Sequence, residues 1–136
     1  MAAPRKLRRP AAREPVPIPD DAVLTQYGML DPAGQPIFRS APRYPREVEL
    51  SMLWGELDVA EAAQLVRKRP AVGDDLVRHC RAGDLRARGF EVDHTPSLSI
   101  PNHVSVTVAA GHVQWDTEQE STFAELFLEP WKGAVD

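Results

Sequence analysis

Alternation of apolar and polar residues marks two segments of the chain, residues 47–54, where Leu53 is the exception, and residues 103–108. Such alternation is typical of a β-strand with one buried face, because successive side chains of a strand point to opposite sides. The apolar positions are Val48, Leu50, Met52 and Trp54 in the first segment and Val104, Val106 and Val108 in the second. Both segments are therefore predicted to be strands.

A further alternating run, residues 112–115, follows residues 103–108 after a short stretch of small residues. Two such runs this close together predict a β-hairpin. If Val104 and Trp115 share the buried face, we expect them to lie opposite each other, and this sets the register of the hairpin. The polar face then carries two pairs, His103 opposite Asp116 and Ser105 opposite Gln114.

Two segments have both helical spacing and a recognisable start. The first begins at Asp58, which with Glu61 has the spacing of a capping box, and it ends before Pro70. Asp116 and Gln119 repeat the capping pattern at the start of a C-terminal helix. Three apolar residues of this last helix are expected to be buried: Phe123, Leu126 and Phe127.

Two shorter helices are predicted between these. One runs from Asp74 or Asp75 to Ala82, because its apolar residues have the spacing of a helix face. These residues are Leu76, Val77 and Cys80. The other covers residues 84–88 and is ended by Gly89, at the position where helices favour a left-handed residue. Extended structure is expected to resume at residues 90–92.

Prolines concentrate at the N-terminal end, where nine of the 13 lie in the first 45 residues. This density limits regular structure there to short pieces. We expect a disordered, basic, proline-rich tail over residues 1–21. Beyond it, residues 22–30 and 37–40 flank a turn at residues 31–34 and form a short hairpin or an extended arm.

The order of these elements predicts an α+β fold. The predicted strands are not separated one by one by helices, so a small, mostly antiparallel sheet packed by two to four helices fits better than a parallel sheet. The length of 136 residues suits one domain. We therefore expect a single domain over residues 22–136.

The composition is that of an ordinary globular protein, with 43% hydrophobic and 26% charged residues. Cys80 is the single cysteine, and the chain has no apolar run of membrane-spanning length. These features predict a soluble, cytoplasmic protein with no membrane association. The frequent Arg, Ala, Pro, Asp and Val residues resemble the usage of GC-rich bacteria.

Charge divides the chain into a basic tail and an acidic body. Residues 1–15 carry a net charge of +4 and the remainder −8, which together give −4. Nucleic-acid binding by the acidic body is not expected, although the tail could make weak, salt-sensitive phosphate contacts. The tail could also contact an acidic partner or lie against its own domain, but we interpret it first as a disordered tail with no dedicated partner.

His103, Ser105 and Asp116 are the candidate catalytic residues. A carboxylate opposite a histidine fixes the tautomer of the ring and raises its basicity, and a serine on the same face completes the set of a hydrolase. However, no nucleophile elbow or glycine-rich oxyanion loop surrounds Ser105. We therefore interpret these residues first as a polar surface, then as a binding surface, and only then as an active site.

No metal site or cofactor site is predicted. His94, His103 and His112 recur every nine residues, a spacing that does not bring ligands together on a helix or along a strand. The glycines form neither a Gly-x-Gly-x-x-Gly nor a P-loop pattern. Cys80 is interpreted as a small core residue rather than a nucleophile.

The favoured function is that of a small interaction or accessory protein that binds another polypeptide or a second copy of itself. The candidate binding residues are Tyr27, Tyr44, His103, Ser105, Gln114 and Trp131. The alternative is a small enzyme or toxin-like catalytic domain that uses the His103, Ser105 and Asp116 face of the sheet.

Overall fold

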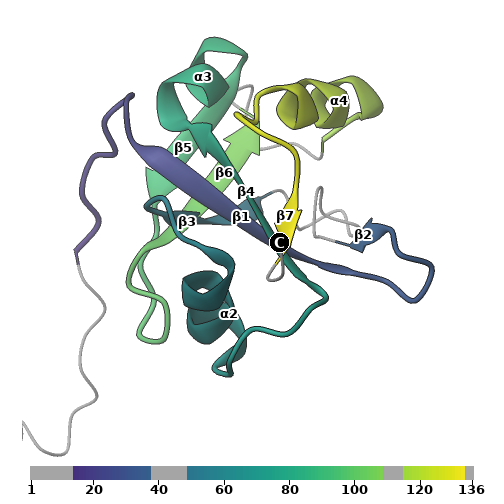
Figure 1. The fold of residues 1–136 in the computed structure, drawn as a ribbon. Coiled ribbons are helices and arrows are strands. Elements are labelled where there is room, and N and C mark those ends of the chain that lie inside the picture. Colours follow the sequence, from purple (N-terminus) through teal and green to yellow (C-terminus); the bar gives the residue numbers. More distant parts are fainter. Residues whose placement is uncertain (1–13, 38–48, 109–114, 134–136) are drawn as a thin grey trace, which may run out of the picture.

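The protein is built on one antiparallel sheet (Figure 1). The computed structural model describes residues 14–37, 49–108 and 115–133. The strands are β1 (Val23–Leu30), β2 (Pro36–Ile37), β3 (Leu50–Trp54), β4 (Asp75–Arg81), β5 (Phe90–His94), β6 (His103–Val108) and β7 (Lys132–Gly133). Their order in the sheet is β5-β6-β3-β1-β4-β7, and β2 pairs with β1. The described helices are α2 (Val59–Arg67), α3 (Ala82–Ala87) and α4 (Thr117–Glu125). The predicted α+β class is confirmed.

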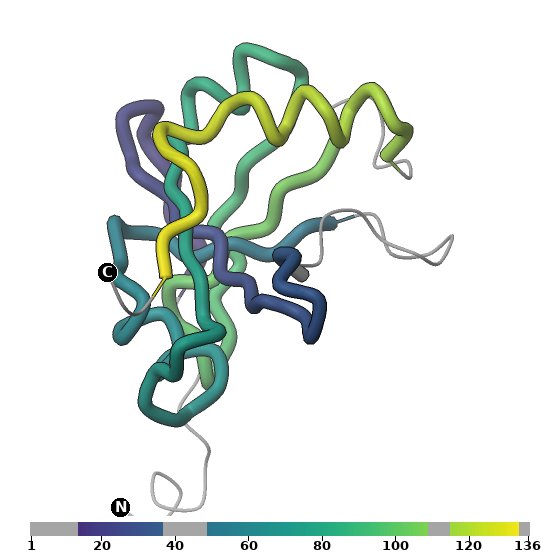
Figure 2. The backbone as a smooth tube through the Cα atoms, turned by 45° about the vertical axis from the view of Figure 1, so that its right-hand side comes forward, coloured from purple at the N-terminus to yellow at the C-terminus, as the bar shows by residue number. Residues whose placement is uncertain are grey.

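The helices lie on opposite sides of the sheet. In both views α3 and α4 are at the top and α2 is at the bottom (Figures 1 and 2). The larger core packs beneath α3 and α4 and includes Leu85, Phe123 and Trp115. A smaller cluster joins α2 to the other face through Val59, Ala62 and strand residues such as Leu53 and Val77. None of the helices in the described part of the chain is long and apolar enough to span a membrane.

Both predicted capping boxes are confirmed. At the start of α2, the carboxylate of Asp58 accepts a hydrogen bond from the Glu61 amide at 2.8 Å, and the Glu61 side chain accepts one from the Asp58 amide at 2.9 Å. Asp116 and Gln119 make the same reciprocal pair at the start of α4. The caps satisfy amides that have no partner within the helix, and this explains why these starts are visible in the sequence.

The prediction of a helix from residue 74 or 75 to Ala82 is wrong, because residues 75–81 form strand β4. It pairs with β1 over seven residues, from Met29–Asp75 to Val23–Arg81. Residues 75–80 are all buried, so both faces of the strand are covered. Leu76 and Cys80 match a helical stripe by coincidence, and pairing across the sheet overrides this local pattern. The short helix predicted next does exist as α3, and Gly89 after it has a φ of 96°.

The predicted register of the hairpin after His103 is also wrong. β6 is a strand, as expected, but β3 and β5 occupy its two edges. His103 lies opposite Leu53, and Val104 lies opposite Met52 on one side and His94 on the other. Residues 109–114, which include the second arm of the predicted hairpin and Gln114, lie outside the described residues. Trp115 is buried against Phe90 and Phe123, with ring centroids 5.0 and 5.4 Å away.

The hairpin expected near the N-terminus is formed by β1 and β2. Before β1, the chain contacts the domain ahead of the boundary expected at residue 21. The Val16 amide donates to His94 Nδ1 at 3.1 Å, and Ile18 is a buried core residue. Arg86 holds the same segment, because its Nη1 donates to the Ile18 carbonyl and the Asp20 carboxylate, both at 2.7 Å. Residues 1–13, and Tyr44 within residues 38–48, lie outside the described residues.

Gly83 is required where this N-terminal segment crosses α3. Its amide donates to the Asp20 carbonyl at 2.8 Å, and a Cβ at Gly83 would lie 2.9 Å from that oxygen. We expect Gly83→Ala to lower the free energy of unfolding by about 1–2 kcal/mol, because the overpacked backbone must move apart. Gly73→Ala is the control, since no atom lies within 4 Å of the added methyl group. Urea unfolding measures both variants, and equal stabilities would contradict the contact.

Candidate functional site

Four polar side chains from three segments meet on the face of the sheet that also carries α2. They are Ser51 on β3, Thr95 directly after β5, and His103 and Ser105 on β6. His103 Nε2 lies 2.9 Å from Ser51 Oγ, and His103 Nδ1 lies 2.8 Å from Thr95 Oγ1. Thr95 Oγ1 lies 2.8 Å from Ser105 Oγ. We call this set the Ser51–His103 cluster.

The neighbours of the His103 ring indicate which nitrogen carries the proton. Nδ1 also lies 3.2 Å from the Thr95 carbonyl oxygen, which only accepts hydrogen bonds. A proton on Nδ1 therefore satisfies both Thr95 atoms and leaves the lone pair of Nε2 facing the Ser51 hydroxyl. This assignment follows from the hydrogen-bond network. With the proton on Nδ1, the Ser51 hydroxyl donates a hydrogen bond to Nε2 of the neutral His103 ring.

The structure brings together only part of the catalytic set predicted from the sequence. Asp116 is not opposite His103, since its carboxylate caps α4. Ser105 is buried and reaches Thr95 rather than the ring. Ser51, which was not predicted as a site residue, lies beside His103 instead. Its position on the polar side of the β3 alternation was the available signal, but the pairing of β3 with β6 decides the contact.

An apolar pocket lies at one end of the sheet. It has a volume of about 540 Å³ and is lined by Val16, Trp54, Leu65, His94, Pro101 and Asn102. These residues come from the N-terminal segment, β3, α2, β5 and the loop before β6. We call it the Trp54–His94 pocket. This pocket was not predictable from the sequence, because its lining is spread over five segments.

Hydrogen bonds to the pocket residues hold its walls in place. His94 accepts from the Val16 amide through Nδ1, and its Nε2 lies 2.9 Å from the Pro101 carbonyl oxygen, to which it donates. Asn102 Nδ2 donates to the Trp54 carbonyl at 3.0 Å. The His94 and Trp54 rings meet edge to face, with centroids 5.3 Å apart. These contacts connect five of the six lining residues to one another.

Two of the aromatic residues predicted to bind a partner have structural contacts. The Tyr27 hydroxyl donates to Asp75 at 2.6 Å, and Arg67 lies over the Tyr27 ring at 5.6 Å. Trp131 packs against the guanidinium of Arg78 at 4.3 Å. Binding by Tyr27 or Trp131 stays a prediction, and Tyr44 lies outside the described residues.

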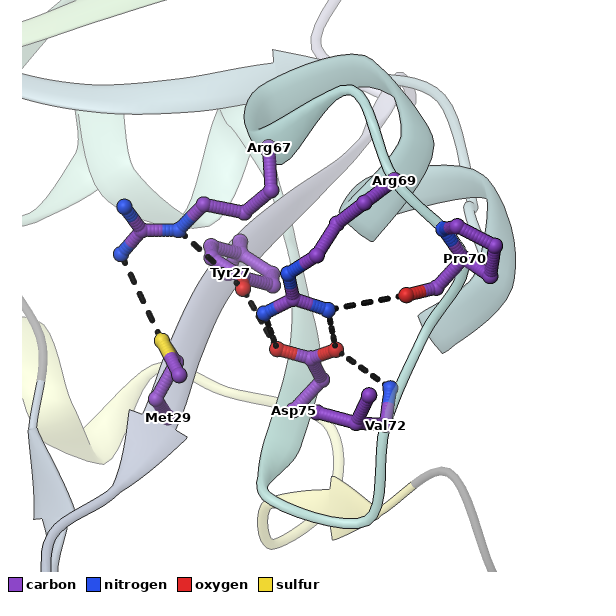
Figure 3. A network of polar contacts seen from close by, with 7 residues as sticks. All are labelled: Tyr27, Met29, Arg67, Arg69, Pro70, Val72 and Asp75. Atoms are coloured by element: carbon purple, nitrogen blue, oxygen red, sulfur yellow. Dashed lines mark hydrogen bonds and ion pairs between the residues drawn. The ribbon is translucent and has the colours of Figure 1, made fainter.

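Asp75 is the centre of the polar network in Figure 3. Its side chain is fully buried and accepts two hydrogen bonds from Arg69, one from Tyr27 and one from the Val72 amide. Burial by itself raises the pKa of Asp75, but the hydrogen bonds from Arg69, Tyr27 and Val72 outweigh it and lower the pKa to about 2. Burial and the hydrogen bond to Asp75 raise the pKa of Tyr27. The network ties the end of α2 to β4, which is a structural role.

Two further buried groups have shifted pKa values. Burial raises the pKa of the Cys80 thiol to about 12, so this side chain remains a neutral core group. Burial lowers the pKa of Arg78 to about 10, while the rings of Phe127 and Trp131 enclose its guanidinium. Among the residues that the structure describes, no group of three His, Cys, Asp or Glu side chains is placed to hold a metal ion.

A second pocket, of about 680 Å³, lies beside β7 and the start of α2. Its buried histidine, His79, has both ring nitrogens engaged. Nε2 lies 2.7 Å from the Leu57 carbonyl oxygen and Nδ1 lies 3.3 Å from the Glu129 carboxylate. Because both ring nitrogens contact groups of the protein, His79 connects these segments rather than offering a free ring nitrogen to a ligand.

No protein family model, no curated protein and no solved structure matches this chain.

Proposed function

We propose that this chain is an interaction protein that binds an extended apolar segment of a partner polypeptide, flanked by acidic residues, in the Trp54–His94 pocket. The observation that carries the proposal is an apolar pocket whose lining includes Val16, directly after the basic residues 1–15 in the sequence. The apolar lining would bind the segment, and the tail would attract its acidic flanks.

The lining supports an apolar occupant. Half-buried Trp54 and Leu65 face the pocket together with Val16, whose residue surface is 46% exposed. Leu98, in the same loop as Pro101, is 49% exposed. Covering such side chains contributes roughly 25 cal/mol per Å² of apolar area removed from water. Tryptophan is also among the residues that dominate binding energy at protein interfaces.

Charge supports an acidic partner. Residues 1–15 carry five basic side chains and one acidic side chain, and they join the pocket at Val16. Lys68 also lies beside this region, because its Nζ donates to the Ser99 carbonyl in the loop that contains Pro101. Complementary charge mainly increases the rate of association and the selectivity for the partner.

A defined set of peptides tests the proposal. We expect a short Leu- and Pro-rich peptide with glutamate flanks to bind the full chain at least tenfold more tightly than the same peptide with lysine flanks. Pro101→Glu places a charge in the pocket lining and should weaken binding of the glutamate-flanked peptide by tenfold or more. Fluorescence anisotropy measures the dissociation constants.

The matched control is Leu128→Glu, which changes an exposed apolar residue that does not line the pocket. It should leave peptide binding unchanged. Equal affinities for both peptides, or equal effects of the two substitutions, would overturn the proposal. Self-association of the chain that Pro101→Glu abolishes would instead assign the pocket to a second copy, and sedimentation analysis distinguishes this outcome.

A further inference from the structure

We propose that Ser51 is a nucleophile activated by His103, and that the cluster cleaves uncharged or cationic carboxylic esters. This activity is separate from partner binding in the Trp54–His94 pocket. The inference rests on the geometry of the Ser51–His103 cluster and on the accessibility of Ser51.

Ser51 is an exposed member of the cluster, as is Thr95, and His103 is half-buried. The residue surface of Ser51 is open to solvent, while Ser105 at the other end of the chain of hydrogen bonds is buried. Strand β1 pairs with β3 only at Leu24–Trp54 and Thr25–Leu53 among the described residues. Ser51 therefore has no partner residue on β1. A substrate can therefore approach the Ser51 hydroxyl from solvent.

His103 is placed to take the proton from Ser51. The 2.9 Å contact between Ser51 Oγ and His103 Nε2 is within the range of a nucleophile and its base. Thr95 holds the ring through two contacts to Nδ1, at 2.8 Å from its hydroxyl and 3.2 Å from its carbonyl. Thr95 is thus a positioning residue, in the place that a carboxylate holds in a Ser-His-Asp triad.

The reaction is an acyl transfer. Ser51 Oγ attacks the ester carbonyl carbon while its proton passes to His103 Nε2, and a tetrahedral intermediate forms. The bond from the carbonyl carbon to the alcohol oxygen then breaks, and the imidazolium protonates the departing alkoxide. A water molecule attacks the acyl-serine in the same way, with His103 as base. The products are the acid and the alcohol, and free Ser51 is restored.

Charge around the cluster selects the class of ester. Glu49 precedes Ser51 by two residues and is exposed, and exposed Asp93 is paired with Ser105 across β5 and β6. The body of the protein also carries a net charge of −8 beyond residue 15. Anionic esters would be repelled from this face, whereas neutral and cationic esters would not.

The test uses a neutral alkyl fluorophosphonate on the full chain. Ser51 Oγ displaces fluoride from phosphorus, and peptide mass spectrometry locates the adduct. We expect one phosphonyl group on Ser51 and none in Ser51→Ala. His103→Gln should lower the rate of labelling about 100-fold or more, which is the usual contribution of a general base. Ser121→Ala, at an exposed serine on α4, is the matched control and should label like the unaltered chain.

Substitutions of Thr95 distinguish a role in positioning the His103 ring from a role in folding alone. Thr95→Val should slow labelling about tenfold without changing the far-UV circular dichroism, and Thr95→Ser should restore the rate because it keeps the hydroxyl. Hydrolysis of a neutral nitrophenyl ester, with a carboxylate-bearing analogue for comparison, tests the selectivity. Absence of an adduct on Ser51, or a labelling rate that His103→Gln does not change, would overturn the proposal.

Discussion

Replacing Phe123 by alanine is expected to lower the free energy of unfolding by about 3–5 kcal/mol. Phe123 is 1% exposed and holds α4 against the sheet. Its ring meets those of Phe90, Trp115 and Phe127 at centroid distances of 6.0, 5.4 and 5.1 Å. The substitution leaves a cavity among these rings in addition to removing apolar contact. Small domains have total stabilities of about 5–15 kcal/mol, so the loss is a large fraction.

Urea unfolding followed by tryptophan fluorescence measures this effect. Leu128→Ala is the control, because Leu128 is 50% exposed and its truncation should change the stability by less than about 0.5 kcal/mol. A loss for Phe123→Ala as small as that of the control would mean that α4 does not pack on the sheet as described.

Asp75→Asn is expected to lower the free energy of unfolding by about 2–3 kcal/mol at pH 7. Asparagine has nearly the same shape, but it removes the charge that Arg69 faces through two bonds of 2.8 and 3.1 Å. The substitution also replaces one carboxylate oxygen, an acceptor, by an amide NH₂ group, a donor. At least one of the donors that face Asp75 (Arg69, Tyr27 or the Val72 amide) then loses its acceptor. Asp74→Asn, at the exposed neighbouring residue, is the matched control and should have little effect.

The same pair of variants tests the pKa of Asp75. Since the fold lowers this pKa from the ordinary 3.8 to about 2, the stability that it contributes is present above pH 4 and is lost as the pH falls from about 4 to 2. The free energy of unfolding of the unaltered chain and of Asp74→Asn should therefore fall more steeply in this window than that of Asp75→Asn. Parallel curves for all three proteins would contradict the lowered pKa.

Features with a local cause were predictable from the sequence. The caps at Asp58 and Asp116 depend on residues three positions apart, and Gly89 takes a backbone angle that favours glycine. The alternation in β3 and β6 also identified one buried face of each strand, with Leu50, Met52, Val104 and Val106 in the core. The expected open face of β6 was wrong, because Ser105 and Thr107 on that face are buried too. For the caps and for Gly89, neighbouring residues contain the physical reason for the structure.

β4 shows where local patterns fail. Its residues Asp75, Arg78 and His79 are polar, and Leu76, Val77 and Cys80 fit a helix face. They form a buried strand because β1 supplies backbone partners and residues elsewhere in the chain contact the polar groups of β4. Arg78 Nε donates to Gln26 at 2.8 Å, and the His79 amide donates to Glu129 at 2.7 Å. None of these partners can be inferred from the segment itself.

The sequence by itself determined the α+β class, the strand character of β3 and β6, and the starts of α2 and α4. Tertiary structure alone decided which polar residues meet. It separated Asp116 from His103, placed Ser51 beside His103, and built the Trp54–His94 pocket from segments between Val16 and Asn102. The physical reason is that caps and alternation follow from contacts a few residues apart. The order and register of the strands depend on pairing and burial across the whole sheet.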